Sequence, residues 1–140
     1  MEKIFEGIFE LFQEQPRRQV NGDKLQIVLE KPFSEEDQKN LVDYFDQSVK
    51  VKIKEHIEGN EKGSIVIIED IFEVTAVKLR RLANGNKTSF VLEKMYDRDN
   101  HRRAVELFQK DVSVFMEIIQ QDLPGMEDEI ENVTPLGGII

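Results

Sequence analysis

The 140-residue sequence contains no cysteine and no tryptophan. Disulfide bonds, thiolate metal sites and cysteine nucleophiles are therefore excluded. No apolar run approaches the roughly 20 residues that a membrane-spanning helix needs. The first residues, Met1 to Gly7, also lack the basic start and the apolar stretch of a secretory signal. These absences lead us to expect a cytoplasmic protein.

Basic residues are in the minority. The chain has 19 Lys and Arg against 28 Asp and Glu, which gives a formal net charge of −9. Such a balance argues against general adhesion to nucleic acid or to anionic lipid. The length fits one domain, and a chain of this size buries enough apolar surface to fold without disulfides or metals.

Recognisable catalytic motifs are also missing. The only histidines, His56 and His101, do not have metal-ligand spacing. The serines lie in no nucleophile motif, and no glycine-rich loop is suited to phosphate binding. We therefore expect no catalytic residues, no bound metal and no cofactor.

The sequence repeats itself after 63 residues without a gap. Residues 6–51 and 69–114 are identical at 17 of 46 aligned positions, where ordinary residue usage gives about three by chance. The identities form blocks, among them Ile-Phe-Glu, Arg-Arg, Asn-Gly and Val-Leu-Glu-Lys. This pattern predicts a tandem duplication within one domain of residues 1–122, with repeats at about 3–56 and 64–119.

Each repeat begins with two predicted strands joined by a tight turn. The first strand covers residues 3–12 in one copy and 64–82 in the other, where β-branched residues are frequent. Pro16 follows the first of these, so that strand is expected to be an edge, to carry a bulge or to be short. An Asn-Gly pair, a strong hairpin signal, comes next in both copies. The return strands are predicted at about 24–31 and 87–94.

A helix and a third strand complete each repeat. Ser34 and Asp97 occupy equivalent positions and are good helix N-caps. Apolar residues at helical spacing follow them, and strict alternation then predicts a half-buried strand. The predicted inward-facing residues are Leu41, Val42, Tyr44 and Phe45 with Val49, Val51 and Ile53 in the first copy, and Ala104, Val105, Leu107 and Phe108 with Val112, Val114 and Met116 in the second.

The predicted order, strand-strand-helix-strand repeated twice, gives an α+β chain that is mainly β. This order and the duplication resemble the cradle-loop barrels, the superfamily of double-psi and related six-stranded barrels built from two ββαβ halves. The resemblance covers about residues 3–120 and includes no sequence motif. Gln47-Ser48 and Lys110-Asp111 stand where such halves often have Gly-Asp. It implies a six-stranded pseudo-twofold barrel with two helices, and closure would remove exposed strand edges. The alternative is two packed ββαβ layers.

The end of the chain, residues 123–140, has a different composition. Residues 126–132 contain four acids and no base, and an apolar segment follows. This layout resembles the tails of bacterial and phage single-stranded-DNA-binding proteins, although the terminal aromatic residue is absent. A partner-docking tail, a solubilising end, and a strand added to the body or to a neighbour are the three interpretations. The docking residues would be Leu136, Ile139 and Ile140.

Basic residues repeat at one place. An Arg-Arg pair precedes the hairpin turn in both copies, and a row of lysines follows one face of the third strand of the first copy. Such rows can position phosphates, but exposed elements also carry Lys and Arg for solubility. The candidate nucleic-acid-binding residues are Arg17, Arg18, Arg80, Arg81, Lys50, Lys52, Lys54, Arg102 and Arg103.

Two functions are favoured by these observations. The first is a non-enzymatic nucleic-acid-associated accessory protein, of the kind that phages and mobile elements encode, with a tail that recruits a partner. The alternative is an acidic protein-binding module or inhibitor that meets a basic protein partner. An enzyme would need a pocket with converging polar groups. Phe115 falls where alternation predicts solvent, so we also expect a covered surface and a homodimer.

Overall fold

The computed structural model describes residues 4–57 and 67–119, which contain six strands and two helices. An α+β chain that is mainly β is therefore confirmed. The tail and its docking candidates Leu136, Ile139 and Ile140 lie outside the described residues. The elements are β1 (Ile4–Arg17), β2 (Lys24–Pro32), α1 (Glu35–Val42), β3 (Ser48–Glu55), β4 (Ile67–Arg80), β5 (Lys87–Met95), α2 (Arg98–Leu107) and β6 (Asp111–Ile118).

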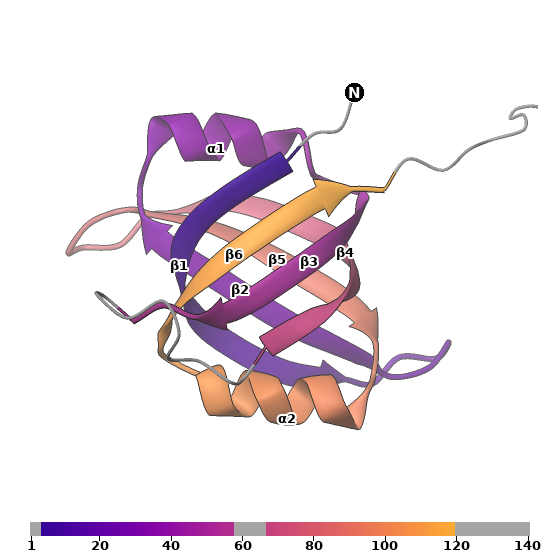
Figure 1. The fold of residues 1–140 in the computed structure, drawn as a ribbon. Coiled ribbons are helices and arrows are strands. Elements are labelled where there is room, and N and C mark those ends of the chain that lie inside the picture. The colour runs from indigo at the N-terminus through magenta and orange to yellow at the C-terminus, as the bar shows by residue number, and fades with distance from the viewer. Residues whose placement is uncertain (1–3, 58–66, 120–140) are drawn as a thin grey trace, which may run out of the picture.

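The six strands form one sheet that closes on itself in the order β1-β2-β5-β4-β3-β6. Every neighbouring pair in this barrel is antiparallel. Figure 1 shows β1, β6, β3 and β4 in front, β2 and β5 behind them, and the two helices on opposite sides. The strand pairing forms one closed sheet and does not form the alternative of two packed ββαβ layers. Within residues 4–57 and 67–119, neither helix is long and apolar enough to cross a membrane.

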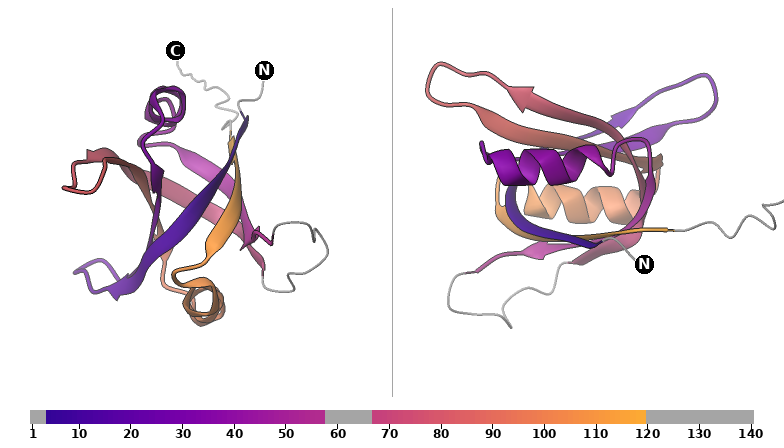
Figure 2. Two further views of the ribbon diagram at one scale, coloured as in Figure 1. Left: turned by 90° about the vertical axis from the view of Figure 1, so that its left-hand side faces the viewer. Right: turned by 90° about the horizontal axis from the view of Figure 1, so that it is seen from above.

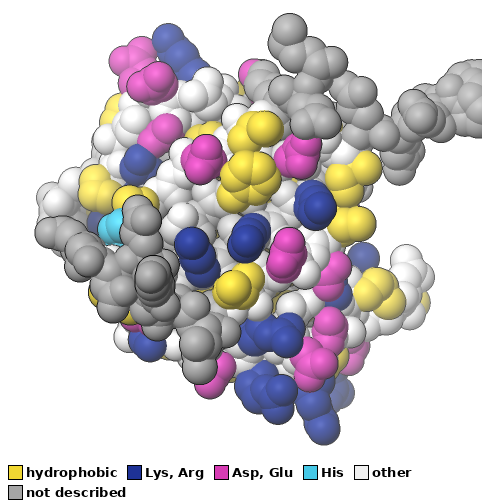
Figure 3. Space-filling view, viewed as in Figure 1, with side chains coloured by type: hydrophobic (Ala, Val, Ile, Leu, Met, Phe, Trp, Pro, Cys, Tyr) yellow, Lys and Arg dark blue, Asp and Glu magenta, His cyan; other side chains and the backbone are white. Residues whose placement is uncertain are grey.

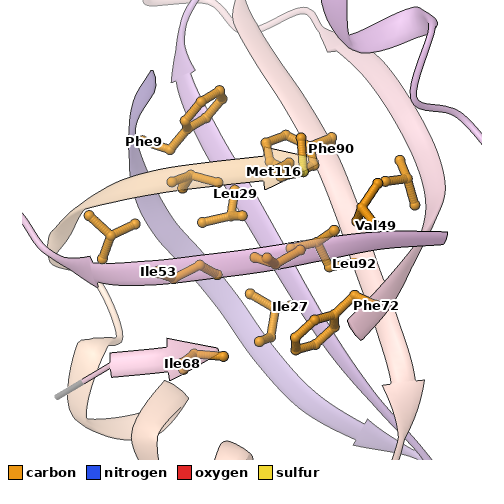
Figure 4. Close-up of a cluster of buried hydrophobic side chains, with 14 of the residues drawn as sticks. Phe9, Ile27, Leu29, Val49, Ile53, Ile68, Phe72, Phe90, Leu92 and Met116 are labelled. Carbon is orange, nitrogen blue, oxygen red and sulfur yellow. The ribbon is translucent and has the colours of Figure 1, made fainter. Parts of the chain in front are cut away.

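The core fills the barrel with the inward-facing residues of all six strands. Alternation places every second residue of a strand on the inner face, and side chains from β1 to β6 meet there (Figure 4). Phe9 and Phe90 pack edge to face with ring centroids 5.1 Å apart. The core residues predicted on the third strand of each repeat are all buried: Val49, Val51, Ile53, Val112, Val114 and Met116.

The helices bury a narrower face than the sequence predicted. Ser34 and Asp97 cap α1 and α2 as expected, each accepting a hydrogen bond from a backbone N–H in the first turn. Leu41 and Tyr44 of the first repeat, and Ala104 and Leu107 of the second, join the core. The other four predicted face residues are exposed, because each helix is short and touches the barrel along one edge only: Val42, Phe45, Val105 and Phe108.

Pro16 does not end the first strand. β1 runs to Arg17, with a bulge between Leu11 and Gln13. β6 pairs with β1 only as far as Glu10, so the Pro16 segment has β2 on one side and no described strand on the other. A residue without an N–H is tolerated at such an edge. Two of the three sequence-based alternatives, an edge and a bulge, therefore apply together.

Strand pairing repeats with the same 63-residue interval as the sequence. The β4–β5 bulge lies between Val74 and Ala76, 63 residues after the bulge of β1. In the β2–β5 ladder Val28 pairs with Val91, and in the β3–β6 ladder Lys52 pairs with Phe115. In both ladders equivalent positions of the two repeats lie directly opposite each other, as a twofold axis through the ladder requires.

Candidate nucleic-acid interface

Two β-hairpins extend beyond the barrel. We call residues 13–26 the first arm and residues 76–89 the second arm. Each is an antiparallel hairpin that begins at a bulge and turns at an Asn-Gly pair, and its β2 or β5 residues also pair with the other repeat. Gly22 and Gly85 have φ of 116° and 125°, which L side chains rarely adopt. Figure 2 shows the two turns beyond the β2–β5 side of the barrel, pointing in opposite directions, because β2 and β5 are antiparallel and each arm leaves from a different end of their ladder.

The arms reverse the charge of the chain. The first arm has three bases and two acids, and the second has four bases and no acid. Together they carry 7 − 2 = +5, so the remainder of the chain carries −9 − 5 = −14. The two arms thus carry a net positive charge on an otherwise acidic protein. The seven arm bases are Arg17, Arg18, Lys24, Lys78, Arg80, Arg81 and Lys87.

Two of the four repeated arginines form equivalent ion pairs across the outer face of the β2–β5 pair. Arg80 of the second arm reaches across β5 to the carboxylate of Glu30 on β2, and the pair is in direct hydrogen-bond contact. Arg17 of the first arm reaches across β2 toward Glu93 on β5, at 3.7 Å. Each arginine therefore ties its arm to the other repeat. Glu30 is only 3% exposed, and Arg80 is the cation that compensates the burial of its carboxylate.

Side-chain hydrogen bonds extend this face on the first-arm side. The Gln15 amide donates to Gln26 Oε1 at 2.9 Å, and the Gln26 amide donates to Glu93 Oε2 at 2.9 Å. At the equivalent positions of the second arm stand Lys78 and Ser89. The first arm thus presents neutral amides at these positions, whereas the second arm presents a lysine and a serine.

The other two repeated arginines, Arg18 and Arg81, lie just beyond the ends of β1 and β4 and are exposed. They stand near the turns of the two arms, where the backbone leaves the ladder. Of the four predicted arginines, the structure therefore ties Arg17 and Arg80 to carboxylates and leaves Arg18 and Arg81 at the surface. All four lie on the arm side of the barrel.

The predicted lysine row lies elsewhere. Lys50, Lys52 and Lys54 follow the outer face of β3, which is three strands away from β2 in the closed order. Their neighbours across β4 and β6 include Glu69, Glu117, Ile71 and Phe115. Figure 3 shows this face, where basic, acidic and hydrophobic side chains are intermixed. The row does not form a continuous basic patch with the arms.

Arg102 and Arg103 are on α2 and are exposed. Arg102 forms an ion pair with Asp99 at 3.5 Å, and Arg103 donates a hydrogen bond to the Asn100 side chain at 3.4 Å. Both partners lie on the same helix. The nine predicted binding residues are thus distributed over three places: the arms, the outer face of β3, and α2.

The outward position predicted for Phe115 agrees with the strand pairing. Its cross-strand partners are Glu6 and Lys52, both exposed, and its own side chain is half-buried. Phe115 therefore belongs to a mixed outer face that also exposes Ile4, Ile8 and Ile71. The homodimer inferred from it remains a prediction.

Sequence reasoning missed the carboxylates that hold the arms. Glu30 and Glu93 are equivalent, and both belong to the repeated Val-Leu-Glu-Lys block. Each follows a core leucine, so alternation already places it on the outer face, beside the arms. Lys24, which pairs with Arg17 in the first arm, was also missed. The repeated Glu, together with the alternation of inward and outward residues along a strand, could have identified these carboxylates from the sequence.

A histidine joins the first arm to α2. His101 Nε2 lies 2.8 Å from Glu14 of the first arm, and its Nδ1 lies 3.0 Å from the Tyr96 hydroxyl. A carboxylate only accepts, so the hydrogen on Nε2 points to Glu14, and in the neutral ring Nδ1 accepts from tyrosine. This chain fixes the base of the first arm. The second arm has Val77 at the position of Glu14, and no such link.

A pocket of about 310 Å³ lies at the barrel rim beside the second arm. Two of its polar groups are already engaged: Glu30 with Arg80, and Lys31 with Asp37. No group of three His, Asp or Glu suited to a metal ion occurs among residues 4–57 and 67–119. The pocket is lined by Ile8, Phe9, Glu10, Glu30, Lys31, Pro32, Lys87 and Asp111.

A second polar network closes the barrel mouth beneath α2. Asp70 accepts hydrogen bonds from its neighbour Ile71 N–H at 2.7 Å and from the buried Asn100 side chain at 2.9 Å, and lies 3.6 Å from Lys94 Nζ. Burial acts to raise the pKa of this carboxyl. The hydrogen bonds from Ile71 and Asn100 and the charge of Lys94 outweigh it, so the pKa of Asp70 lies below its ordinary value.

We expect Asp70→Asn to lower the free energy of unfolding at neutral pH by about 1 kcal/mol, because the carboxylate is partly exposed. A depressed pKa adds stability above the unfolded pKa, and this stability is lost as pH falls through the folded pKa. The difference from wild type should therefore shrink in acid. Urea titrations across the acid range measure it, with exposed Asp99→Asn as the control. A difference independent of pH would contradict this assignment.

No family model matches the sequence, and no curated protein is significantly similar to it. The function is therefore inferred from the chain's own residues.

Proposed function

We propose that the protein is a non-enzymatic nucleic-acid-binding accessory protein whose two arms contact phosphates. The observation that carries the proposal is the segregation of charge: +5 on the arms and −14 on the rest of the chain. An acidic protein can bind nucleic acid when its bases gather on one side. The acidic remainder would repel other phosphates and thereby orient the protein with its arms toward the ligand.

The arms also suit phosphate contact mechanically. Arg17 and Arg80 are held by Glu93 and Glu30, and the first arm is joined to α2 through Glu14 and His101. Cations on such a frame lose less conformational freedom on binding than cations on a flexible loop. Arg18 and Arg81, exposed at the ends of the arms, are the side chains we expect to reach phosphates first.

We further propose that the fold arose by duplication of a ββαβ unit and belongs with the cradle-loop barrels. Support comes from the bulges, the helix caps and the ladders, all of which recur at the 63-residue interval. The positive φ of 64° at both Asp46 and Gln109, again 63 residues apart, repeats as well. Independent convergence on so many equivalent backbone details would be improbable. A duplicated unit also accounts for having two arms rather than one.

Binding of fluorescent DNA and RNA at several salt concentrations tests the function. We expect binding that weakens with salt, with a slope reduced by about 0.9 for each phosphate contact removed. Arg18→Ala/Arg81→Ala should therefore reduce the slope by about 2 without changing the melting temperature. Arg102→Ala, an exposed arginine outside the arms, is the matched control. Absence of binding by wild-type protein at low salt would overturn the proposal.

The same assay also tests the role of the tail, residues 123–140. Residues 126–132 add four negative charges, which would compete with phosphates for the arms. A chain ending at Asp122 is therefore expected to bind more tightly than the full chain, with the difference disappearing at high salt. Equal binding by both chains would show that the tail does not compete with phosphates for the arms.

The alternative, an acidic module for a basic protein partner, is favoured by the surface around α1. Residues 33–48 carry five acids and one base, whereas the equivalent residues 96–111 carry four of each. Val42 and Phe45 are 56% and 52% exposed there. An acidic surface with apolar centres fits a basic, partly apolar partner. Tight capture of such a partner by a protein that binds no nucleic acid would favour this second function.

A further inference from the structure

The outer face of β1, β6, β3 and β4 exposes apolar side chains among charged ones (Figure 3). The outward positions of β1 and β4 share one pattern, in which a glutamate stands between two isoleucines: Ile4, Glu6 and Ile8 on β1, and Ile67, Glu69 and Ile71 on β4. Three of these isoleucines, Ile4, Ile8 and Ile71, are exposed. Exposed isoleucines around the half-buried Phe115 are typical of a surface that another protein covers.

The two central strands of this face differ in chemistry. Their outward residues are Lys50, Lys52 and Lys54 on β3, and Ser113, Phe115 and Glu117 on β6. The two rows come from equivalent positions of the repeats, since Lys52 precedes Phe115 by 63 residues and pairs with it across the ladder. One half of the face is therefore basic, and the other half is aromatic and acidic.

The two halves become complementary when a second copy of the chain is turned over and placed on the first. Rotation about an axis that runs along the strands, between β3 and β6, puts β3 of each copy over β6 of the other. Sheets that pack face to face keep their strands aligned in this way. The ladder register then sets Lys50 against Glu117 of the second copy, and Lys52 against its Phe115. These are a pair of opposite charges and a cation beside an aromatic ring.

The side chains also select between the two ways of turning the second copy over. Rotation about the other axis in the plane of the face, across the strands, would put β3 over β3. Lys50 would then face Lys54, and Lys52 would face its own equivalent, which brings like charges together. Glu6 meets a glutamate in either orientation and does not discriminate between them. The near-twofold backbone permits both, and the lysine row favours the first.

We propose that this face joins two copies of the chain in a twofold dimer, with β3 of each copy over β6 of the other. Self-complementarity is the reason for choosing a second copy as the occupant, because each copy supplies the half that the other lacks. The arms stay free in such a dimer, since the β2–β5 pair lies opposite the β3–β6 pair in the closed sheet (Figure 1). The proposal therefore does not depend on nucleic-acid binding.

Sedimentation equilibrium of the full-length protein over a range of concentrations tests the dimer. We expect a dimer that dissociates on dilution. Lys50→Glu and Glu117→Lys each place like charges at both contacts between the copies, so each alone should weaken the dimer at least about tenfold. In an equimolar mixture of the two variants, a heterodimer has opposite charges at both contacts. It should form at least about tenfold more tightly than either variant alone associates with itself.

Matched variants separate this interface from general charge effects. Lys39→Glu makes the same change of charge on α1, where Lys39 is exposed. It should leave the dimer unchanged, and mixing it with Glu117→Lys should not produce the preferred heterodimer. Phe115→Ser should weaken the dimer, whereas Phe45→Ser, which removes an exposed ring outside this face, should not. Thermal melts verify that every variant is folded.

Three results would overturn the proposal. The first is a full-length protein that is monomeric at every concentration, including the case in which only a chain ending at Asp122 dimerises, because the tail would then be the occupant of this face. The second is a dimer that Lys50→Glu and Glu117→Lys leave unchanged. The third is a mixture of these two variants without preference for the heterodimer, which would rule out the proposed orientation. A dimer that binds no nucleic acid would keep this inference and overturn only the proposed function.

Discussion

Arg80→Ala is expected to lower the free energy of unfolding by about 2–3 kcal/mol, because it removes a half-buried partner from a buried carboxylate. Glu30 is 3% exposed and would be left with an uncompensated charge. Arg80 also lies over the Phe12 ring, 4.8 Å from its centroid, and that contact is lost as well. Because domains of this size have only about 5–15 kcal/mol in total, a substantial part of the stability would disappear. Urea denaturation measures the effect.

The repeat supplies a matched control for Arg80. Arg17→Ala removes the equivalent arginine, but Arg17 is 51% exposed and 3.7 Å from Glu93, so we expect a loss below about 1 kcal/mol. Adding Glu30→Gln to Arg80→Ala should recover part of the loss, because the unpaired charge is then gone. Equal effects of Arg80→Ala and Arg17→Ala would show that the burial of Glu30 does not matter. Binding tests accordingly use Arg18 and Arg81.

Phe9→Ala is expected to cost about 3–5 kcal/mol, because it opens a cavity in the barrel that the closed sheet cannot collapse to fill. Phe9 is almost completely buried, and its ring contacts Phe90 edge to face and lies 5.9 Å from Phe5. The backbone of Gly7 also approaches it, since a Cβ there would lie 3.0 Å from the Phe9 ring. Thermal and urea unfolding by circular dichroism provide the measurement.

Phe45→Ala is the control for this core substitution. Phe45 is 52% exposed, so its removal should change the free energy of unfolding by no more than about 0.5 kcal/mol. If Phe45→Ala were as destabilising as Phe9→Ala, the helix would be packed more tightly than the structure shows. If Phe9→Ala cost less than about 1 kcal/mol, the core would be able to rearrange around the missing ring.

Local features of this fold could be predicted from the sequence because they depend on near neighbours. The Asn-Gly turns, the caps at Ser34 and Asp97, and the alternation of Val49, Val51 and Ile53 each need only a few adjacent residues. Repetition strengthened every such prediction by giving it twice. The exposure of Val42 and Phe45 was missed, since which part of an apolar helix face touches the barrel depends on how the helix is docked.

The candidate site was harder to predict because it depends on strand order. The Arg-Arg pairs were recognised, but the partners of Arg17 and Arg80 are 76 and 50 residues away in sequence and two strands away in the sheet. Only the closed order β1-β2-β5-β4 places them together. The same order separates Lys50, Lys52 and Lys54 from the arms. Charge counts along a sequence carry no information about which side of a barrel each residue faces.

The unequal arms have a consequence for anything that spans both. The two repeats are related by a twofold axis near the Val28–Val91 pair. If the two arms were identical, a ligand that contacts both could bind in two opposite orientations of equal energy. Here one arm carries a net +1 and the other +4, so the two orientations differ. A ligand whose two ends differ would therefore bind in a preferred orientation, with one particular end beside the second arm. Near-symmetry of the backbone with divergence of the side chains thus gives the protein polarity.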